Sequence, residues 1–248
     1  MTVPPVPLLI VDDDAFMRSG LRLFLESRGY SVEETGDVWE AWARLRAQPP
    51  AAAVVDLSLP ADEHGQAAPA VGLSFVAQLK AEYPSLGVVI LSAYEYYLED
   101  VLAIIRGGAR GLAYMLKGRR SAGLLTALER VLAGHVEIDP EVRVERPALA
   151  REILAQLTPE ERPWVEQALA RFDDLTPQEA RAAHLLAASC NTQGVAQRLG
   201  IQRADTLITR VYNTLGLDEL AEAAPDLRQV ALLIKTCQIR DLQDKDRP

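Results

Sequence analysis

Residues 8–14 read Leu-Leu-Ile-Val-Asp-Asp-Asp, a short apolar run that ends in three acids. Similar apolar runs follow at residues 52–55, 88–91 and 112–116. Each run is too short for a buried helix, amphipathic helical patterns separate the runs, and residues 31–33 form a weaker strand candidate. This alternation predicts an α/β fold, a doubly wound five-stranded parallel sheet with helices on both faces.

The chain has 248 residues, which favours two domains, and its 49% hydrophobic and 25% charged residues exclude a disordered or disulfide-stapled protein. From about residue 137 the pattern changes, and Pro140 and Pro147 interrupt a charged stretch. We therefore expect an α/β domain at 6–135, a linker at 136–157 and an all-α domain at 158–248.

Two copies of one helix-start signal open the all-α part. They are Leu-Thr-Pro-Glu-Glu at 157–161 and Leu-Thr-Pro-Gln-Glu at 175–179. In each copy Thr is expected at the N-cap, Pro at the first helical position and Glu at the third, where it completes a capping box. Gly200 and Gly216 are expected to end helices. The predicted helices lie at about 176–189, 192–199, 204–215 and 226–237, after an additional helix within 148–172.

Acidic, hydroxyl and basic side chains end four of the predicted strands. They are Asp12 and Asp13 after the first strand, Asp56 after the third, Ser92 after the fourth and Lys117 after the fifth. The binding edge of a doubly wound sheet is the one formed by the carboxyl ends of its strands. Three carboxylates at that edge repel one another and require a hard divalent cation, most naturally Mg²⁺. With a lysine and a hydroxyl nearby, the set suits transfer of a phosphoryl group onto a carboxylate. Asp14 is instead expected to be the N-cap of the next helix.

Four motifs in order resemble the receiver domain of bacterial two-component response regulators. They are LLIVDDDAFMRSGLRLFLESRGY, VVDLSLP, VVILSA and GGARGLAYMLKG, within residues 6–135. The resemblance implies that Asp56 accepts phosphate from the phosphohistidine of a sensor kinase, which would be a partner. It also implies the following roles: Asp13, Asp56 and the Ser58 backbone carbonyl bind Mg²⁺, Asp12 acts through a bound water, Ser92 and Lys117 contact the phosphoryl group, and Tyr114 is a rotating aromatic switch.

The chain departs from the receiver pattern in three places. Eleven residues lie between Pro60 and Gly72 where receivers usually have about three, and we expect a surface loop there rather than a shield over the site. Gly118 replaces a proline common in receivers, so no cis-proline is expected after the lysine. Tyr94 is bulky and lies near the path of a hydrolytic water, which suggests a phosphoryl group that hydrolyses slowly.

One class of enzyme shares part of this set. Haloacid-dehalogenase-type phosphatases also use Asp-x-Asp after the first strand, a Ser or Thr after a later strand, and a lysine. However, no acidic pair follows Lys117 at a strand end, and Asp56 would have no role. We therefore expect a protein that is not an enzyme, apart from assisting its own phosphotransfer and dephosphorylation.

The segment LTPQEARAAHLLAASCNTQGVAQRLGIQRADTLITRVYNTLGL resembles the helix-turn-helix output domain of LuxR/NarL-type regulators, with the motif at about 176–216. In this fold the second helix enters the DNA major groove, and here it would be about 204–215. Arg can read guanine, Asn can read adenine, and Thr or Arg can contact phosphate. The candidate DNA contacts are Arg203, Thr206, Thr209, Arg210 and Asn213. Asp205 would repel phosphate unless it caps the helix.

The net charge of −9 is unfavourable for binding DNA, whose phosphates favour basic surfaces. Residues 1–157 carry 15 Lys and Arg against 21 Asp and Glu, a net of −6, and residues 158–248 carry 11 against 14, a net of −3. A homodimer formed on phosphorylation would compensate by doubling a weak half-site. The alternative is an output domain that binds a protein partner rather than DNA.

Cys190 and Cys237 lie far apart without a metal-binding spacing, so we expect free thiols and no zinc site. The sequence has no apolar run of membrane-spanning length and no signal-peptide pattern at its start. We therefore expect a cytoplasmic protein with no membrane partner.

Overall fold

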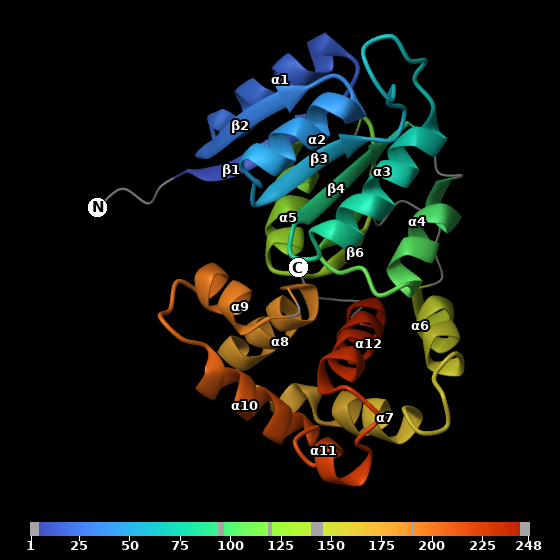
Figure 1. Cartoon of the computed structure of the whole chain (residues 1–248), viewed down its shortest axis with the longest axis vertical. Helices are drawn as coiled ribbons and strands as arrows, with labels where there is room; N and C mark the ends of the chain where they lie inside the picture. Colours follow the sequence, from blue (N-terminus) through green and yellow to red (C-terminus); the bar gives the residue numbers. More distant parts are fainter. Residues whose placement is uncertain (1–4, 94–96, 119–120, 140–145, 190, 244–248) are drawn as a thin grey trace.

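The computed structural model describes residues 5–93, 97–118, 121–139, 146–189 and 191–243. An α/β half, residues 5–139, lies above an all-helical half, residues 146–243, in the view of Figure 1. In the described ranges every helix is too short or too polar to cross a bilayer.

The α/β half contains one parallel sheet in the order β2-β1-β3-β4-β5-β6. Its strands are β1 (Val6–Val11), β2 (Tyr30–Thr35), β3 (Ala52–Asp56), β4 (Gly87–Ser92), β5 (Leu112–Leu116) and β6 (Val136–Ile138). The expectation of five strands is therefore corrected to six. The extra strand is a three-residue segment, too short for a periodicity to reveal, and it lies where a linker was expected.

Five helices cover the two faces of the sheet: α1 (Ala15–Glu26), α2 (Val38–Ala47), α3 (Pro69–Glu82), α4 (Leu98–Arg106) and α5 (Ser121–Leu132). Side chains alternate along a strand, so Leu8 and Ile10 pack toward α1 and α5, whereas Leu9 and Val11 face α2, α3 and α4. This doubly wound arrangement confirms the predicted α/β class.

The helical half contains α6 (Arg146–Ala155), α7 (Arg162–Ala170), the 3₁₀ turn η2 (Phe172–Asp174), α8 (Pro177–Ser189), α9 (Thr192–Leu199), α10 (Asp205–Leu215), α11 (Leu220–Ala223) and α12 (Gln229–Gln243). The single helix expected within 148–172 is two helices, because Leu157-Thr158-Pro159 turns the chain between them. The last helix begins three residues later than expected and ends six residues later, at Gln243.

Both predicted capping boxes are present. Glu161 accepts from the Thr158 backbone N–H at 3.1 Å, and Thr158 Oγ1 accepts from the Glu161 N–H at 3.2 Å. Thr176 and Glu179 make the same reciprocal pair at 3.0 and 3.3 Å. The second box starts α8 as predicted, but the first caps a turn that precedes α7, which begins at Arg162 instead of Pro159.

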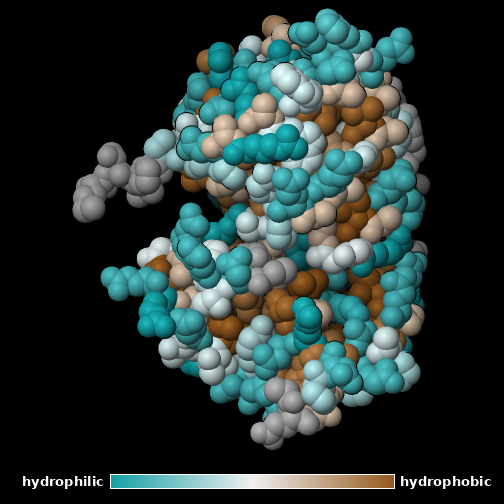
Figure 2. Space-filling model, viewed as in Figure 1, coloured by the Kyte–Doolittle hydropathy of each residue, from teal (hydrophilic) through white to brown (hydrophobic). Residues whose placement is uncertain are grey.

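The two halves share one hydrophobic core, which runs from the sheet through α4 and α6 to α8 and α12. Figure 2 shows apolar residues gathered along the junction of the halves. At Gly134, with a φ of +86°, a Cβ would lie 2.6 Å from the carbonyl oxygen of His184 on α8. Glycine is therefore required where the loop between α5 and β6 approaches α8.

Candidate functional site: an acidic pocket and a helical face

The carboxyl ends of β1, β3, β4 and β5 bring the predicted pocket residues to one edge of the sheet. Asp12, Asp56 and Ser92 are buried there, with 1%, 5% and 2% of their surface exposed. Lys117 reaches between the two carboxylates, with its Nζ 3.0 Å from Asp12 Oδ2 and 2.8 Å from Asp56 Oδ2. One cation thus bridges two buried acids that the sequence separates by 44 residues.

The third acid, Asp13, lies on the exposed side of the same pocket. Asp12, Asp13 and Asp56 each offer a carboxylate oxygen, and these oxygens lie within 4.8 Å of one another. Three carboxylates and one lysine leave a formal charge of −2, which a divalent cation with oxygen ligands would balance. The residues therefore fit Mg²⁺, with one open side for water or phosphoryl oxygens.

The pKa values in the pocket reflect burial and pairing. Burial raises the pKa of Asp56 above its ordinary value, an effect opposed by the hydrogen bond and charge of Lys117. Burial lowers the pKa of Lys117, but its bond to Asp56 and the charges of Asp12 and Asp56 outweigh this, so that the net shift of the pKa is upward. A metal cation beside Asp56 would favour its ionised, nucleophilic form.

Arg18 is a supporting residue that the sequence analysis missed. Its NH1 donates to the backbone carbonyl of Asp12 at 2.6 Å, and a Cβ at Gly36 would lie 3.3 Å from the same guanidinium nitrogen. Asp14 caps α1 as predicted, accepting from the N–H groups of Phe16 and Met17. These local bonds fix the loop that carries Asp12 and Asp13.

The segment expected to be an insertion loop is only partly a loop. Its last three residues, 69–71, form the first turn of α3, and residues 61–67 are exposed. The loop is tied at both ends, because Trp39 N–H donates to Ala61 O at 2.9 Å and Ala68 N–H donates to Leu59 O at 3.1 Å. It projects from the top of the sheet in Figure 1.

Gly72 sets the distance between α3 and the end of β3, the strand that carries Asp56. A Cβ there would lie 2.2 Å from the carbonyl oxygen of Leu57, the residue after Asp56. On the other side of the pocket, Gly118 has a φ of +85°, and the described chain contains no cis peptide, as expected for this position. Tyr114 is completely buried in β5, and Tyr94 lies outside the described residues.

The candidate DNA contacts lie together on one exposed face of α10 and the turn before it. These residues are Arg203, Thr206, Thr209, Arg210 and Asn213. Both arginines lie near acids: Arg203 Nε is 3.2 Å from Asp205 Oδ2, and Arg210 Nε is 3.9 Å from Glu179 Oε1. Asp205 is not the N-cap of α10, a correction to that expectation. Ala204 occupies the cap without a side-chain bond, while the Asp205 carboxylate faces Arg203.

Free thiols were expected at both cysteines, and the structure describes one of the two. Cys237 is a buried free thiol in α12, and burial raises its pKa to about 12. Cys190 lies outside the described residues.

A doubly wound parallel domain with this acidic pocket, followed by helices that include a helix-turn-helix, defines the class of receiver-containing regulators. The response regulator receiver domain family matches residues 8–129. The chain is 30% identical over 196 residues to the transcriptional activator protein ExaE of Pseudomonas putida, covering 78% of this chain and 81% of that protein. The chain belongs to the two-component response regulators of the LuxR/NarL type.

Other relatives extend the match across nearly the whole chain. The transcriptional regulatory protein YdfI of Bacillus subtilis is 25% identical over 232 residues, covering 91% of this chain and 97% of that protein. Among solved structures, a LuxR-family two-component response regulator from Aurantimonas is 26% identical, with a TM-score of 0.45 and coverage of 61% of this chain and 97% of that one.

Proposed function

We propose that this response regulator is phosphorylated on Asp56 by a sensor histidine kinase and controls transcription through α10. Phosphorylation on Asp56 is supported above all by the position of Lys117. Its ammonium group lies within 3.0 Å of the carboxylates of both Asp12 and Asp56. Asp12, Asp13, Asp56 and the Ser58 carbonyl would hold Mg²⁺. The cation would neutralise charge on the transferring phosphoryl oxygens.

The chain's own groups account for the transfer. An Asp56 carboxylate oxygen attacks phosphorus, the P–N bond of the kinase phosphohistidine breaks, and the imidazole nitrogen keeps the electron pair. The product is an acyl phosphate on Asp56. Lys117 then has a phosphoryl oxygen as a partner, and Ser92 and Tyr114 transmit the change. Beyond its own phosphorylation and dephosphorylation, the protein performs no catalysis.

An apolar hollow beside Lys117 supports docking of a helical kinase partner. It has a volume of about 430 Å³ and lies between α1 and α5, with Phe16, Phe24 and Leu124 in its lining. Phe16 is 88% exposed, which is unusual for a phenylalanine without a partner. Phe24 is partly buried and packs against the core beneath α1.

The DNA-binding part of the proposal rests on the uniform exposure of the α10 face. A cytoplasmic homodimer formed on phosphorylation would present two such faces to DNA. The competing function, binding of a protein partner, is favoured by the acids that lie beside Arg203 and Arg210. It is also favoured by the net charge of −3 over residues 158–248.

Beryllofluoride with Mg²⁺, a mimic of the phosphoryl group, separates these possibilities. The full-length protein, with and without the mimic, is used to select sheared DNA of its own genome, and Asp56→Asn serves as the control. We expect a recurring sequence enriched only with the mimic and only with Asp56 intact. Failure of the wild type to bind beryllofluoride would contradict the phosphoacceptor assignment. Binding of the mimic without enrichment of DNA would favour a protein partner.

A further inference from the structure

A cleft of about 480 Å³ lies between the two halves, at the amino end of β6 and far from the acidic pocket. The α/β half contributes the end of α5 and the start of β6. The helical half contributes η2 and the first two turns of α8. The lining residues used below are Arg130, His135, Phe172, Asp173, Arg181 and His184.

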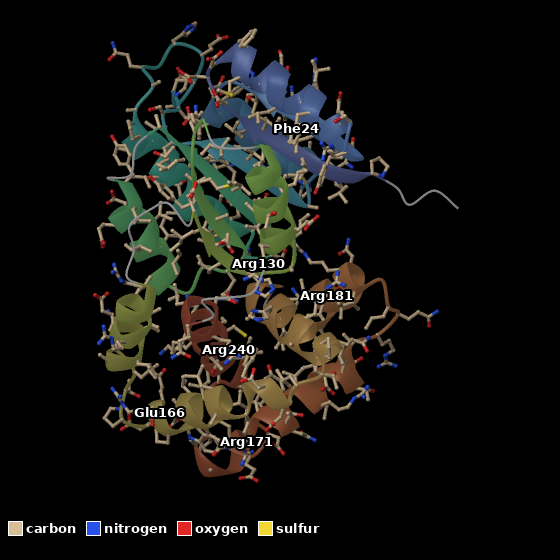
Figure 3. The ribbon with its side chains drawn as sticks, turned by 180° about the vertical axis from the view of Figure 1, so that it is seen from behind. Phe24, Arg130, Glu166, Arg171, Arg181 and Arg240 are labelled. Carbon is tan, nitrogen blue, oxygen red and sulfur yellow. The ribbon has the colours of Figure 1, made fainter. Side chains whose placement is uncertain are left out.

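Arginines from both halves face this cleft. Arg130 ends α5 and Arg181 lies on α8, and Figure 3 shows them on opposite sides of the junction. Arg181 is exposed, and within the described ranges no acid lies in ion-pair distance of it. Arg130 engages Glu137 through Nε alone, at 3.3 Å. The one acid in the lining, Asp173, is paired with Arg240 at 2.5 Å. The cleft therefore has an excess of positive charge.

His184 adds a buried donor to the wall. Only 5% of its surface is exposed, and its Nδ1 lies 2.8 Å from Arg110 NH2. A guanidinium can only donate, so Nδ1 is the acceptor, and Nε2 carries the proton of the neutral ring. Burial holds the pKa of His184 well below its ordinary value, which agrees with a neutral ring. No described residue accepts from Nε2.

The cleft is not a metal site, although a possible ligand group lies beside it: His135, His184 and Asp241. Their ligand atoms lie within 4.8 Å of one another, but the Arg110 guanidinium already lies 2.6 Å from Asp241 Oδ2 and bonds His184 Nδ1. The cation of this cluster is therefore an arginine of the chain itself. Its charge is balanced by Asp241, so the positive charge of the cleft comes from Arg130 and Arg181.

The geometry points to a binding site for a small oxyanion, a phosphate or a carboxylate, held by Arg130, Arg181 and the Nε2–H of His184. Phe172 provides an apolar wall for the rest of such a ligand. Because its donors come from both halves, a bound anion would stabilise their contact, and the stabilisation would grow with the logarithm of the anion concentration above its Kd. This ligand site is separate from phosphorylation on Asp56.

The chain has three histidines, and their NMR signals can test this site. His135 and His184 line the cleft, whereas His64 lies on the exposed loop near the acidic pocket. Full-length protein labelled with ¹⁵N-histidine is titrated with inorganic phosphate, and separately with citrate, at constant ionic strength and without Mg²⁺. We expect saturable shifts of the His135 and His184 imidazole signals and none at His64. Shifts at His64 alone, or at no histidine, would overturn the assignment.

The variant Arg181→Ala tests whether Arg181 donates to the bound anion, and Arg171→Ala is the matched control. Both arginines are exposed on the helical half, but Arg171 lies away from the cleft in Figure 3. Loss of one charge-assisted bond should weaken phosphate binding roughly tenfold in Arg181→Ala, and Arg171→Ala should bind as the wild type does. Equal weakening in both variants would indicate general charge attraction and reject the site. Unchanged binding by Arg181→Ala would reject it as well.

Discussion

The guanidinium of Arg110, in the loop before β5, lies 2.6 Å from the carboxylate of Asp241 on the last helix. Asp241 also accepts from the backbone N–H of Val136 at 3.2 Å and pairs with His135 Nδ1 at 3.1 Å. Arg110 and Asp241 are 1% and 8% exposed, so a charged pair is buried between the two halves. The core contacts and this pair together make the junction a continuous part of the fold.

Replacing Asp241 with Asn should destabilise the protein strongly. The substitution leaves the Arg110 guanidinium buried without a counter-charge, which costs about 3–5 kcal/mol in comparable cases. Urea unfolding of the full chain measures the change, with Asp226→Asn in the exposed turn before α12 as the control. In the double variant Arg110→Met/Asp241→Leu most of the loss should be recovered. Equal stability of Asp241→Asn and wild type would show that the pair does not hold the junction.

Stability should fall as the pH is lowered. The pKa of His184 is depressed from 6.5 by burial, and that of Asp241 is depressed from 3.8, since the charge of Arg110 and the hydrogen bond with His135 outweigh its burial. Unfolding therefore takes up a proton on His184 below about pH 6.5, and one on Asp241 below about pH 3.8. Thermal melts between pH 7.5 and 5.5 should show a steeper decline for the wild type than for His184→Gln. Parallel declines would contradict a buried neutral His184.

Lys117→Met should tighten Mg²⁺ binding while impairing phosphorylation. Removal of the ammonium changes the formal charge of the pocket from −2 to −3, and the attraction for a divalent cation rises accordingly. Calorimetric titration should show binding tighter by about an order of magnitude, whereas acetyl phosphate should label Asp56 more slowly. Arg28→Met, on the surface after α1, is the control. Weaker Mg²⁺ binding in the Lys117 variant would indicate that Lys117 organises the ligands instead of opposing the cation.

Two glycine substitutions should have opposite effects. In Gly72→Ala the new methyl would lie 2.2 Å from Leu57 O, so α3 must move away from the strand that carries Asp56. We expect a loss of about 1–3 kcal/mol in unfolding free energy. Gly20→Ala meets nothing within 4 Å on the exposed side of α1 and should gain about 0.5–1 kcal/mol. A neutral Gly72→Ala would mean that α3 is loosely packed at this point.

Asp205→Asn should strengthen binding to DNA by releasing Arg203 and removing a charge that repels phosphate. Arg210→Ala should weaken it and flatten its dependence on salt. Fluorescence anisotropy with the DNA selected in the presence of beryllofluoride, at several salt concentrations, measures both effects. If neither variant changes DNA affinity, the α10 face is not the DNA-binding surface.

The site at the sheet edge was predictable because its geometry follows from topology. Parallel strands end at a shared edge, so Asp12, Asp56, Ser92 and Lys117 meet once the strands are recognised. The capping boxes of Thr158 and Thr176 depend only on residues three positions apart and are equally visible in the sequence.

The junction of the halves was not predictable in this way. Arg110 and Asp241 are separated by 131 residues, and neither belongs to a motif with a fixed spacing. The division of the segment 148–172 into two helices, α6 and α7, was also not predicted, although the helix-start signal at Thr158 indicated a break there. The proline in that signal prevents the preceding residue from continuing a helix.

The sixth strand has a consequence for how the protein can be divided. β6 satisfies the outer backbone groups of β5 at Leu112, Ala113 and Tyr114, and it is only three residues long, so it leaves little unpaired edge of its own. A fragment cut at residue 135 would expose those groups of a fully buried, apolar strand to solvent and to other molecules. Such an edge is a template for intermolecular β-pairing and aggregation. A fragment that keeps residues 136–139 would retain the covering strand and should stay in solution far longer.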